Sequence, residues 1–371
     1  MKAVILVGGE GTRLKPLTCN TPKAIVPILN RPFLEHMLRY LHSHGITDVI
    51  LAMGYLPDPI QQCLGDGRQF GVKLTFLVED SPLGTAGAVK NAEQFLDDTF
   101  VVFNGDVLTE IDLSDMIKRH RTLKPARRSP GTLAGEPKVS IALTPVENPT
   151  IYGVVETDAD GRVRRFVEKP SWDKVTTNMI NAGIYVLEPE VLALIPPATR
   201  YMFEHHVFPS LLEKGELMLA YPSDAYWIDI GTPEKYLKAN HDLLRRWGKE
   251  VRKQGESRIA ASARIEGPVL IGRDCVIGEG VRITGPTVLG PKCQVAAGAT
   301  IERAVVWGGS KVAEEATLKD CIVGASNCIK SHCFIPEECV LGDNVTVESG
   351  SKLARGAHVP PNSYVKSDLS R

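Results

Sequence analysis

A glycine-rich loop near the N-terminus is followed closely by two cationic side chains. Gly8, Gly9 and Gly11 come directly after an apolar stretch, Arg13 lies just beyond them, and Lys23 follows further along. Backbone N–H groups of such a loop can approach phosphate oxygens closely, and a guanidinium can bind a phosphate through paired hydrogen bonds. Together these residues predict a phosphate-binding site.

The same loop differs from two common phosphate-binding motifs. A P-loop would end in Gly-Lys-Ser or Gly-Lys-Thr after four intervening residues, and no such run follows here. A dinucleotide-binding G-x-G-x-x-G would begin at Gly9, but its last position is Leu14. The loop therefore predicts phosphate binding of another kind.

Two aspartates stand at the ends of apolar strands further along the chain. Asp106 ends the run Phe-Asn-Gly-Asp, and Asp229 lies in Trp-Ile-Asp-Ile-Gly. Each by itself is also what a turn or a helix cap would use. As a pair beside a phosphate they suit Mg²⁺, which prefers oxygen ligands and keeps several waters. We therefore expect both carboxylates to hold Mg²⁺.

Strands and helices alternate through the first half of the chain. The pattern predicts strands at 2–7, 49–53, 73–78 and 100–103, and helices at 33–44, 57–64, 85–95 and 113–120. This order is typical of a mostly parallel, Rossmann-like α/β sheet in three layers, in which ligands bind beyond the carboxyl ends of the strands. Further strands are predicted at 139–143, 154–156, 163–167 and 180–186, and a helix from 233 to about 253.

A period of six residues marks the C-terminal part of the chain. Apolar residues recur at this spacing, with two one-residue slips between the two runs: Ile265, Ile271, Ile277, Ile283, Leu289, Val295 and Ile301, then Val323, Ile329, Ile335, Leu341, Val347, Leu353 and Val359. Stacked triangular coils with one inward residue per face explain this period. We predict a left-handed parallel β-helix of hexapeptide repeats over 251–371, after an α/β catalytic domain over 1–250.

We expect the coils to assemble a homo-oligomer rather than to react. Solenoid ends must be capped or paired, so a chain truncated at about Glu250 should change oligomeric state and keep some turnover. Six of the eight cysteines lie in the coils, and none of them forms a C-x-x-C pair. We interpret them as small apolar residues with reduced thiols, and not as a zinc site.

Composition describes an ordinary globular protein. The chain has 371 residues, 43% hydrophobic and 23% charged, with a net charge of -1, so no overall field favours nucleic acid or an anionic membrane. The N-terminal apolar run ends too early, at Gly8 and Gly9, for a signal peptide, and no run reaches transmembrane length. We expect a cytoplasmic protein.

Several motifs in a fixed order resemble one enzyme family. The chain is similar over nearly its whole length to the sugar-1-phosphate nucleotidyltransferases. The motifs that carry this similarity are, in order, G-G-E-G-T-R-L-K-P-L-T, T-P-K-A-I-V-P-I, P-L-G-T-A-G, F-N-G-D, Y-G-V-V, F-V-E-K-P, N-A-G-I-Y and W-x-D-I-G-T-P. With the hexapeptide tail, the chain most resembles the branch that forms GDP-mannose from GTP and mannose-1-phosphate. The implied nucleophile is an anionic phosphate oxygen, so catalysis should rest on positioning and charge neutralisation.

The resemblance also implies roles for individual residues. Arg13 and Lys23 would neutralise the triphosphate, Asp106 and Asp229 would hold Mg²⁺, and Lys169 would contact the sugar phosphate. The residues placed around the nucleotide are Leu6, Gly8, Gly9, Gly11, Thr12, Glu79, Gly84 and Thr85. Those placed at the sugar are Gly153, Glu168 and Asn181.

The resemblance places the segment that begins at Glu79 against the base. Guanine offers N1–H and N2–H₂ side by side, and one carboxylate can accept both. Uracil and thymine offer one N–H between two carbonyls, and adenine offers no ring N–H at that edge. Glu79 therefore predicts GTP as the nucleotide; the alternative interpretation is a solvated loop acid.

Other functions remain open at this point. The same scaffold could form UDP- or dTDP-glucose, or act as a regulatory sensor of sugar nucleotides. The coils could transfer acyl groups, with His332 or His358 as a base, although a solvated coil residue is the simpler interpretation of each histidine. The basic stretch 121–138 is predicted to be a mobile loop, either a solvated insertion or a lid over the substrate.

Overall fold

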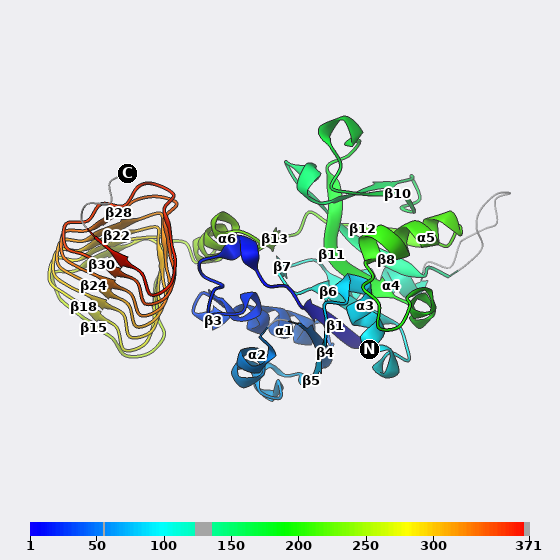
Figure 1. The fold of residues 1–371 in the computed structure, drawn as a ribbon, viewed down its shortest axis with the longest axis horizontal. Coiled ribbons are helices and arrows are strands. Elements are labelled where there is room, and N and C mark those ends of the chain that lie inside the picture. Colours follow the sequence, from blue (N-terminus) through cyan, green and yellow to red (C-terminus); the bar gives the residue numbers. More distant parts are fainter. Residues whose placement is uncertain (55, 123–135, 367–371) are drawn as a thin grey trace. The chain divides into compact units, whose positions relative to one another are not determined.

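The computed structural model describes residues 1–54, 56–122 and 136–366 (Figure 1). The chain packs as two compact units. The first comprises Met1–Gly9 and Leu34–Ile228, and the second comprises Glu10–Phe33 and Asp229–Arg371. The short segment from Glu10 to Phe33 therefore packs with the C-terminal part of the chain, although it is close in sequence to the first strand.

A nine-stranded sheet forms the centre of the first unit. Its strands are β1 (Lys2–Val7), β4 (Asp48–Met53), β5 (Lys73–Val78), β6 (Phe100–Asn104), β8 (Val139–Pro145), β9 (Gly153–Thr157), β10 (Val163–Glu168), β11 (Met179–Leu187) and β12 (Met218–Pro222). The order is β10-β9-β11-β6-β1-β4-β5, with β8 pairing both β11 and β12. Every strand predicted for the first half forms; β12 was not predicted.

The sheet is mixed rather than mostly parallel throughout. β6, β1, β4 and β5 run parallel, as the alternating pattern predicts. β11 runs antiparallel to β6, β8 and β9, and the chain reverses between β9 and β10, which pair antiparallel through a short connection. The parallel half carries the glycine loop and the Asn-Gly-Asp motif.

Helices cover both faces of this sheet. They are α1 (Phe33–Ser43), α2 (Pro57–Leu64), α3 (Gly84–Asn91), α4 (Leu113–Thr122) and α5 (Phe208–Glu213). Val4 and Val102 pack into a core that includes residues of α3 and α5. Phe103 faces the opposite side, where its ring meets Tyr40 of α1 with centroids 6.0 Å apart. Since neighbouring strand residues face opposite ways, the sheet is the middle of three layers, as predicted.

Two short elements complete the first unit. β7 (Val107–Thr109) pairs with β13 (Trp227–Asp229).

The helix predicted over 85–95 is interrupted, because α3 ends at Asn91 and a 3-10 turn follows at Glu93–Phe95.

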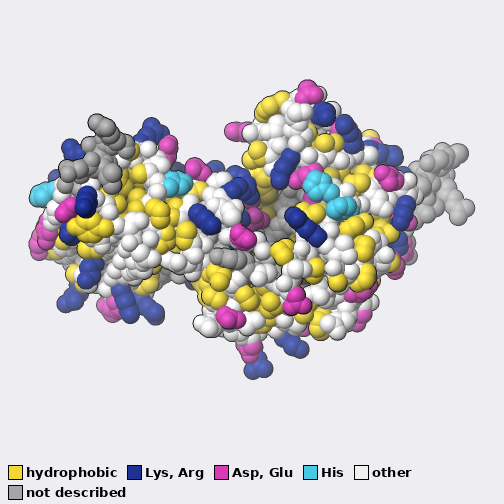
Figure 2. Space-filling view, viewed as in Figure 1, with side chains coloured by type: hydrophobic (Ala, Val, Ile, Leu, Met, Phe, Trp, Pro, Cys, Tyr) yellow, Lys and Arg dark blue, Asp and Glu magenta, His cyan; other side chains and the backbone are white. Residues whose placement is uncertain are grey.

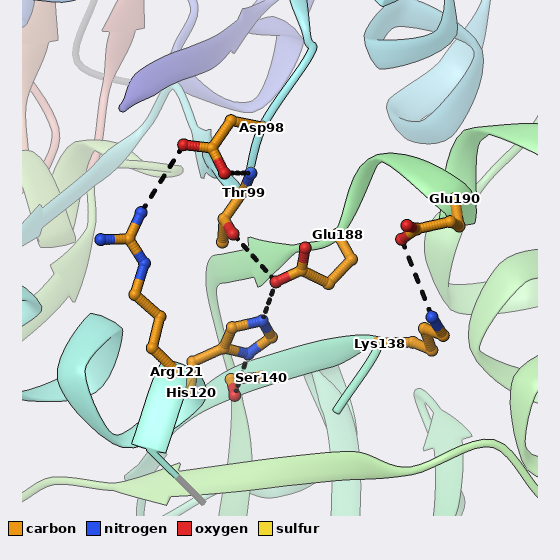
Figure 3. A network of polar contacts seen from close by, with 8 residues as sticks. All are labelled: Asp98, Thr99, His120, Arg121, Lys138, Ser140, Glu188 and Glu190. Carbon is orange, nitrogen blue, oxygen red and sulfur yellow. Dashed lines mark hydrogen bonds and ion pairs between the residues drawn. The ribbon is translucent and has the colours of Figure 1, made fainter. Parts of the chain in front are cut away.

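Hydrogen bonds of the buried His120 side chain connect the end of α4 to the sheet (Figure 3). Nδ1 of His120 lies 2.8 Å from Oγ of Ser140, and Nε2 lies 2.9 Å from Oε1 of Glu188. The same Glu188 oxygen accepts the hydroxyl of Thr99 at 2.9 Å. Ser140 is only 3% exposed, so this Ser-His-Glu series is a structural network and not a nucleophilic triad. Of the predicted basic loop 121–138, residues 123–135 lie outside the described residues.

Three parallel sheets form the coils of the second unit (Figure 1). The first contains β14 (Val251–Lys253), β17 (Val269–Ile271), β20 (Thr287–Leu289), β23 (Val305–Val306), β26 (Ile322–Val323), β29 (Val340–Leu341) and β31 (His358–Val359). The second contains β15 (Arg258–Ile259), β18 (Val276–Ile277), β21 (Gln294–Val295), β24 (Lys311–Val312), β27 (Cys328–Ile329), β30 (Thr346–Val347) and β32 (Tyr364–Val365). The third contains β16 (Arg264–Glu266), β19 (Arg282–Thr284), β22 (Thr300–Glu302), β25 (Thr317–Lys319) and β28 (Phe334–Ile335).

The predicted apolar column is the core of this β-helix. Twelve of the fourteen positions are buried in one cluster, and the two end residues, Ile265 and Val359, pack against it. The slips arise where a coil is one residue shorter, as where Val288 pairs with Val305. Five of the six coil cysteines are buried in the same cluster, whereas Cys328 is half-buried outside it. The described residues contain no group of three or more His, Cys, Asp or Glu suited to a metal.

The helix predicted from 233 to about 253 is shorter than expected. α6 (Pro233–Arg245) begins after Thr232, whose hydroxyl accepts the N–H of Lys235 at 3.4 Å, and ends eight residues early. Gly248 has a φ of 64°, and the next residues form β14, which pairs with β17. Pairing with the coil satisfies the backbone there in place of a helix.

Two surface properties agree with the composition. No helix among the described residues combines the length and apolar character needed to span a membrane. On the face drawn in Figure 2, Lys and Arg side chains are interspersed with Asp and Glu.

Candidate functional site

Three parallel strands of the first unit bring Gly8 and Glu79 together. Gly8 follows β1, Gly54 follows β4 and Glu79 follows β5. A β-carbon on Gly8 would lie 3.8 Å from Oε1 of Glu79, and one on Gly54 would lie 3.3 Å from the carbonyl oxygen of Gly8. This edge of the sheet is where the α/β pattern predicts a ligand.

Glu79 is held as an acceptor at this edge. Its Oε2 accepts the backbone N–H of Leu83 at 3.0 Å, and the side chain is half-buried. Burial raises the pKa of the Glu79 carboxyl above its ordinary value, while the Leu83 N–H acts in the opposite direction. A carboxylate has about four lone-pair sites, so one bond to the backbone leaves it able to accept hydrogen bonds from a ligand.

The segment before α5 packs tightly on the start of α3. A β-carbon on Gly84, which has a φ of 72°, would lie 2.7 Å from the carbonyl oxygen of Tyr201. The hydroxyl of Thr85 donates to Oε2 of Glu204 at 2.8 Å and accepts the N–H of Phe203 at 2.9 Å. Glu204 is buried in a π-helix at 203–207. Glu204 was not predicted as a site residue, because a π-turn has no simple periodic signal in the sequence, although such turns are common at functional sites.

The Asn-Gly-Asp motif follows β6 at the same edge. A β-carbon on Gly105 would lie 2.3 Å from the carbonyl oxygen of Leu6, so only glycine allows this close approach of β6 to β1. The next residue, Asp106, is half-exposed in the turn before β7. Asn104 Oδ1 is buried with no hydrogen-bond partner among the described residues. Asn104 is a further candidate that the sequence analysis missed, although the motif contained it.

A second group of polar residues gathers where β9, β10 and β11 meet. A β-carbon on Gly153 would lie 2.8 Å from Oε2 of Glu168, so the absence of a side chain leaves room for this carboxylate. Burial raises the pKa of Glu168 above its ordinary value and Glu204 raises it further, while Lys169 and His205 act against them. Nζ of Lys169 lies 3.6 Å from Oε1 of Glu168 and the Lys169 side chain is largely exposed.

Asn181 is engaged within the protein. Its Nδ2 donates to the hydroxyl of Tyr185 at 2.8 Å, and its Oδ1 accepts the N–H of Gly183 at 2.9 Å. Both ends of the amide therefore have internal partners. Since Oδ1 retains a second lone pair, the side chain can still accept one hydrogen bond from a ligand.

Within the second unit, Lys23 lies near Gly11, and Arg13 and Asp229 lie near Gly231. Gly11 has a φ of 65°, and a β-carbon there would lie 3.1 Å from Cβ of Lys23. Thr12 and Arg13 form a 3-10 turn with Leu14 directly after Gly11. A β-carbon on Gly231 would lie 2.7 Å from Oδ2 of Asp229 and 3.2 Å from Nη2 of Arg13. Gly231 therefore lies between two residues that the sequence places far apart.

Asp229 has another cationic neighbour in the same unit. It is 7% exposed, and its Oδ1 forms an ion pair with Nζ of Lys235, in the first turn of α6. Lys235 was not predicted as a site residue, although it lies two residues after the end of the W-x-D-I-G-T-P motif. Asp106 belongs to the first unit and Asp229 to the second.

The donor set of the two aspartates fits Mg²⁺. Both side chains offer hard carboxylate oxygens, and Mg²⁺ is usually bound by one or two carboxylates together with waters and substrate phosphates.

The coil histidines show no catalytic arrangement. His332 and His358 are both exposed, and His332 lies at a left-handed corner with a φ of 59°. This is the geometry of solvated coil residues, which was the simpler interpretation of the sequence.

Comparison with known proteins covers both parts of the chain. Residues 2–246 match the family described as nucleotidyl transferase, and residues 249–353 match the EIF2B subunit epsilon LbH domain. The mannose-1-phosphate guanyltransferase of Pichia angusta is 38% identical over 379 residues, covering 100% of this chain and 98% of that protein. The UTP–glucose-1-phosphate uridylyltransferase of Synechocystis is 35% identical, covering 89% and 88%.

Solved structures resemble the chain as well. The crystal structure of HddC from Yersinia pseudotuberculosis complexed with GMP-PN is 32% identical, with a TM-score of 0.53, and covers 65% of this chain and 99% of its own. The chain is thus similar to relatives over its whole length and to solved structures over about two thirds of it.

Proposed function

Because the chain belongs to the nucleotidyl transferase family, we propose that it transfers GMP from GTP to mannose-1-phosphate. A phosphate oxygen of mannose-1-phosphate attacks the α-phosphorus of GTP, the bond from that phosphorus to the β-phosphate oxygen breaks, and pyrophosphate leaves. The product is GDP-mannose. Several relatives of nearly full coverage carry the name mannose-1-phosphate guanyltransferase or guanylyltransferase, which supports this reaction over others of the family.

The observation that carries the choice of base is the Glu79 carboxylate beside Gly8. Guanine presents two adjacent donors that one carboxylate can accept. The bond from Leu83 to Oε2 holds the carboxylate in place, so it is oriented before the base arrives. Glu79 therefore selects guanine over uracil and thymine in this proposal, with Gly8, Gly9, Gly84 and Thr85 around the nucleotide.

Charge neutralisation is assigned to three cationic side chains and to a metal held by two aspartates. Arg13 and Lys23 bind the triphosphate, and Lys169 binds the phosphate of the sugar. Asp106 and Asp229 would hold Mg²⁺, which supplies positive charge to the developing pyrophosphate. The attacking oxygen is already anionic, so these residues need no general base among them and act by orientation and electrostatic stabilisation.

The sugar is assigned to the polar group at β9, β10 and β11. The Glu168 carboxylate accepts hydrogen bonds from sugar hydroxyls in the space that Gly153 leaves open. The acceptor Oδ1 of Asn104 has no partner among the described residues, and a ligand hydroxyl or a water would satisfy it. Asn181 and Glu204 contribute mainly by fixing their neighbours, since each is bonded within the protein.

A pyrophosphate-release assay with a substrate panel tests the proposal. GTP, UTP, dTTP and ATP are each paired with mannose-1-phosphate and with glucose-1-phosphate, and an acyl-CoA incubation serves as the control for chemistry at the coils. We expect the highest kcat/KM for GTP with mannose-1-phosphate. A preference for UTP or dTTP with glucose-1-phosphate would replace the proposal with the second candidate, which the similarity to the uridylyltransferase of Synechocystis supports.

The panel also separates an enzyme from a sensor. Binding of GTP or GDP-mannose without pyrophosphate release from any pair would indicate a regulatory protein. We further propose that the protein acts in the cytoplasm as a homo-oligomer joined through the β-helix. A sizing column on the full chain, with light scattering, tests the oligomer, and a monomer at all concentrations would contradict it.

A further inference from the structure

We propose that the β-helix holds the segment 10–33 in its active conformation, with Tyr236 and Trp307 as positioning residues for Arg13 and Lys23. The inference rests on the proposed function, because it is that function that assigns the two cations to the triphosphate. All the residues that carry it belong to the second unit.

A chain of buried hydrogen bonds connects the coil to the segment. Nε1–H of Trp307 donates to the hydroxyl of Tyr236 at 2.8 Å, and that hydroxyl donates to the carbonyl oxygen of Pro27 at 2.5 Å. Trp307 follows β23 of the coil, Tyr236 lies on α6, and Pro27 opens β2 (Pro27–Ile28). A single hydroxyl thus joins three separate parts of the unit.

The hydroxyl of Tyr236 is suited to this role. Tyr236 is 0% and Trp307 is 5% exposed, so both side chains are shielded from water. Burial raises the pKa of Tyr236 far above its ordinary value, which keeps the proton on the hydroxyl. Indole N–H can only donate and a carbonyl can only accept, so the tyrosine hydroxyl must accept from Trp307 and donate to Pro27.

The hairpin that begins at Pro27 makes further hydrogen bonds of the same kind. The N–H of Leu29 donates to Oδ1 of Asn240 at 3.0 Å, and Nδ2 of Asn240 donates to the backbone oxygen of Tyr236 at 3.0 Å. Nδ2 of Asn30 donates to the carbonyl oxygen of Leu289 at 2.9 Å. These bonds run from the hairpin to α6 and to the coil strand β20.

The hairpin conformation depends on these hydrogen bonds. Leu29 and Asn30, between β2 and β3 (Arg31–Pro32), have φ values of 49° and 62°. A leucine in the left-handed region is strained and persists only where its surroundings impose it. Asn240, Leu289 and the buried position of Leu29 supply those surroundings.

The segment has little regular structure of its own. Between Glu10 and Phe33 it forms two 3-10 turns, at Thr12–Leu14 and Lys23–Ile25, and the two-residue strands of the hairpin. The second turn carries Lys23 and ends two residues before Pro27. Its position must therefore come from what it packs on, and a displacement of about 1 Å at a catalytic group can cost about 100-fold in rate.

This anchoring revises what the repeat alone indicates about truncation. Removal of the residues after about Glu250 would delete Trp307 and Leu289, together with the coil that supports α6. We now expect such a truncation to lose most of its turnover rather than to keep it. Point variants in the full chain test this more cleanly, because the coil stays folded.

The test uses Tyr236→Phe and Trp307→Phe, which each remove one link and keep an aromatic ring. Tyr364→Phe, at an exposed coil tyrosine, is the matched control. We expect amide hydrogen exchange in peptides from 10–33 to speed up by about 10-fold or more while most coil peptides stay protected. We also expect kcat/KM for GTP to fall about 10-fold or more, with KM for mannose-1-phosphate little changed.

The outcomes separate this inference from the proposed function. Unchanged exchange over 10–33 in both variants would overturn the anchoring, whatever the activity. A general loss of protection across the coil in both, with both KM values altered alike, would also overturn it in favour of plain destabilisation. If the wild type releases no pyrophosphate from any pair, the proposed function fails and the exchange result still decides the anchoring.

Discussion

The carboxylate of Glu79 faces the main chain of Gly8, with no side chain between them. A β-carbon on Gly8 would stand 3.8 Å from Oε1, while Oε2 is fixed by the N–H of Leu83. An acceptor is therefore held in place directly beside the glycine loop. The choice of base can therefore be tested by one substitution, Glu79→Gln, which replaces a carboxylate oxygen with an amide nitrogen.

Glu79→Gln should weaken the preference for GTP over UTP. The amide offers one acceptor and places donors against guanine N1–H or N2–H₂, and an unmatched buried polar group costs about 1–3 kcal/mol. We expect the ratio of kcat/KM values for GTP and UTP to fall roughly 10- to 100-fold. The matched control is Asp80→Asn, since Asp80 is the exposed neighbour. An unchanged ratio in Glu79→Gln would show that the base is selected elsewhere.

Asp106→Asn and Asp229→Asn should each reduce kcat by about 100-fold or more, as the loss of a transition-state stabiliser does elsewhere. Asparagine keeps the shape and removes the charge that would hold Mg²⁺. Titration with Mg²⁺ should show a higher half-saturating concentration in both variants. Asp160→Asn, at an exposed turn, should behave as wild type. Full activity in Asp106→Asn would remove that residue from the metal site.

Gly231→Ala should damage catalysis without unfolding the protein. The new methyl group would stand 2.7 Å from Oδ2 of Asp229 and 3.2 Å from Nη2 of Arg13, so both side chains must shift. Since the φ of Gly231 is not in the left-handed region, the backbone itself tolerates alanine. We expect kcat to fall by about 10- to 100-fold, as for other misplaced catalytic groups, with a small change in Tm. A wild-type kcat in Gly231→Ala would mean that Asp229 and Arg13 can move aside without loss of activity.

His120 should make the protein less stable at mildly acidic pH (Figure 3). Burial lowers its pKa below the ordinary value of 6.5 and Arg121 acts the same way, while Glu188 opposes them. The unfolded chain therefore binds a proton that the folded one does not. The contribution of His120 to the free energy of unfolding is fully present above about pH 6.5, the pKa in the unfolded chain. It is lost as pH falls towards the pKa of the folded state, by at most about 1.4 kcal/mol per pH unit.

Thermal unfolding between pH 7.5 and pH 5 checks this prediction. His120→Gln removes the titrating ring and should flatten the fall in Tm below pH 6.5, although Tm at neutral pH will be lower because the bonds to Ser140 and Glu188 are altered. His358→Gln, at an exposed coil position, should leave the profile unchanged. An equally steep fall in His120→Gln would assign the pH dependence to other groups.

Local pattern was enough to predict most elements of the fold. A strand such as Lys2–Val7 is identified by a short apolar run that ends in glycines, and the coils by a strict six-residue period, because both signals lie within a few neighbouring residues. The motif order also indicated Arg13, Asp106 and Glu79 as candidates. Where local signals conflict the prediction was wrong: the charged stretch after Arg245 resembles a helix, but it pairs with the coil as β14.

Which distant residues meet follows from the packing of whole elements and not from local pattern. Residue types and spacing were enough to identify a glycine loop, two cations and two aspartates, and to predict that a β-helix follows them. They could not show that Gly231 lies between Asp229 and Arg13, or that the hydroxyl of Tyr236 joins Trp307 to Pro27. Those contacts span long stretches of chain, and each depends on how whole elements pack, so no periodicity or local spacing records them.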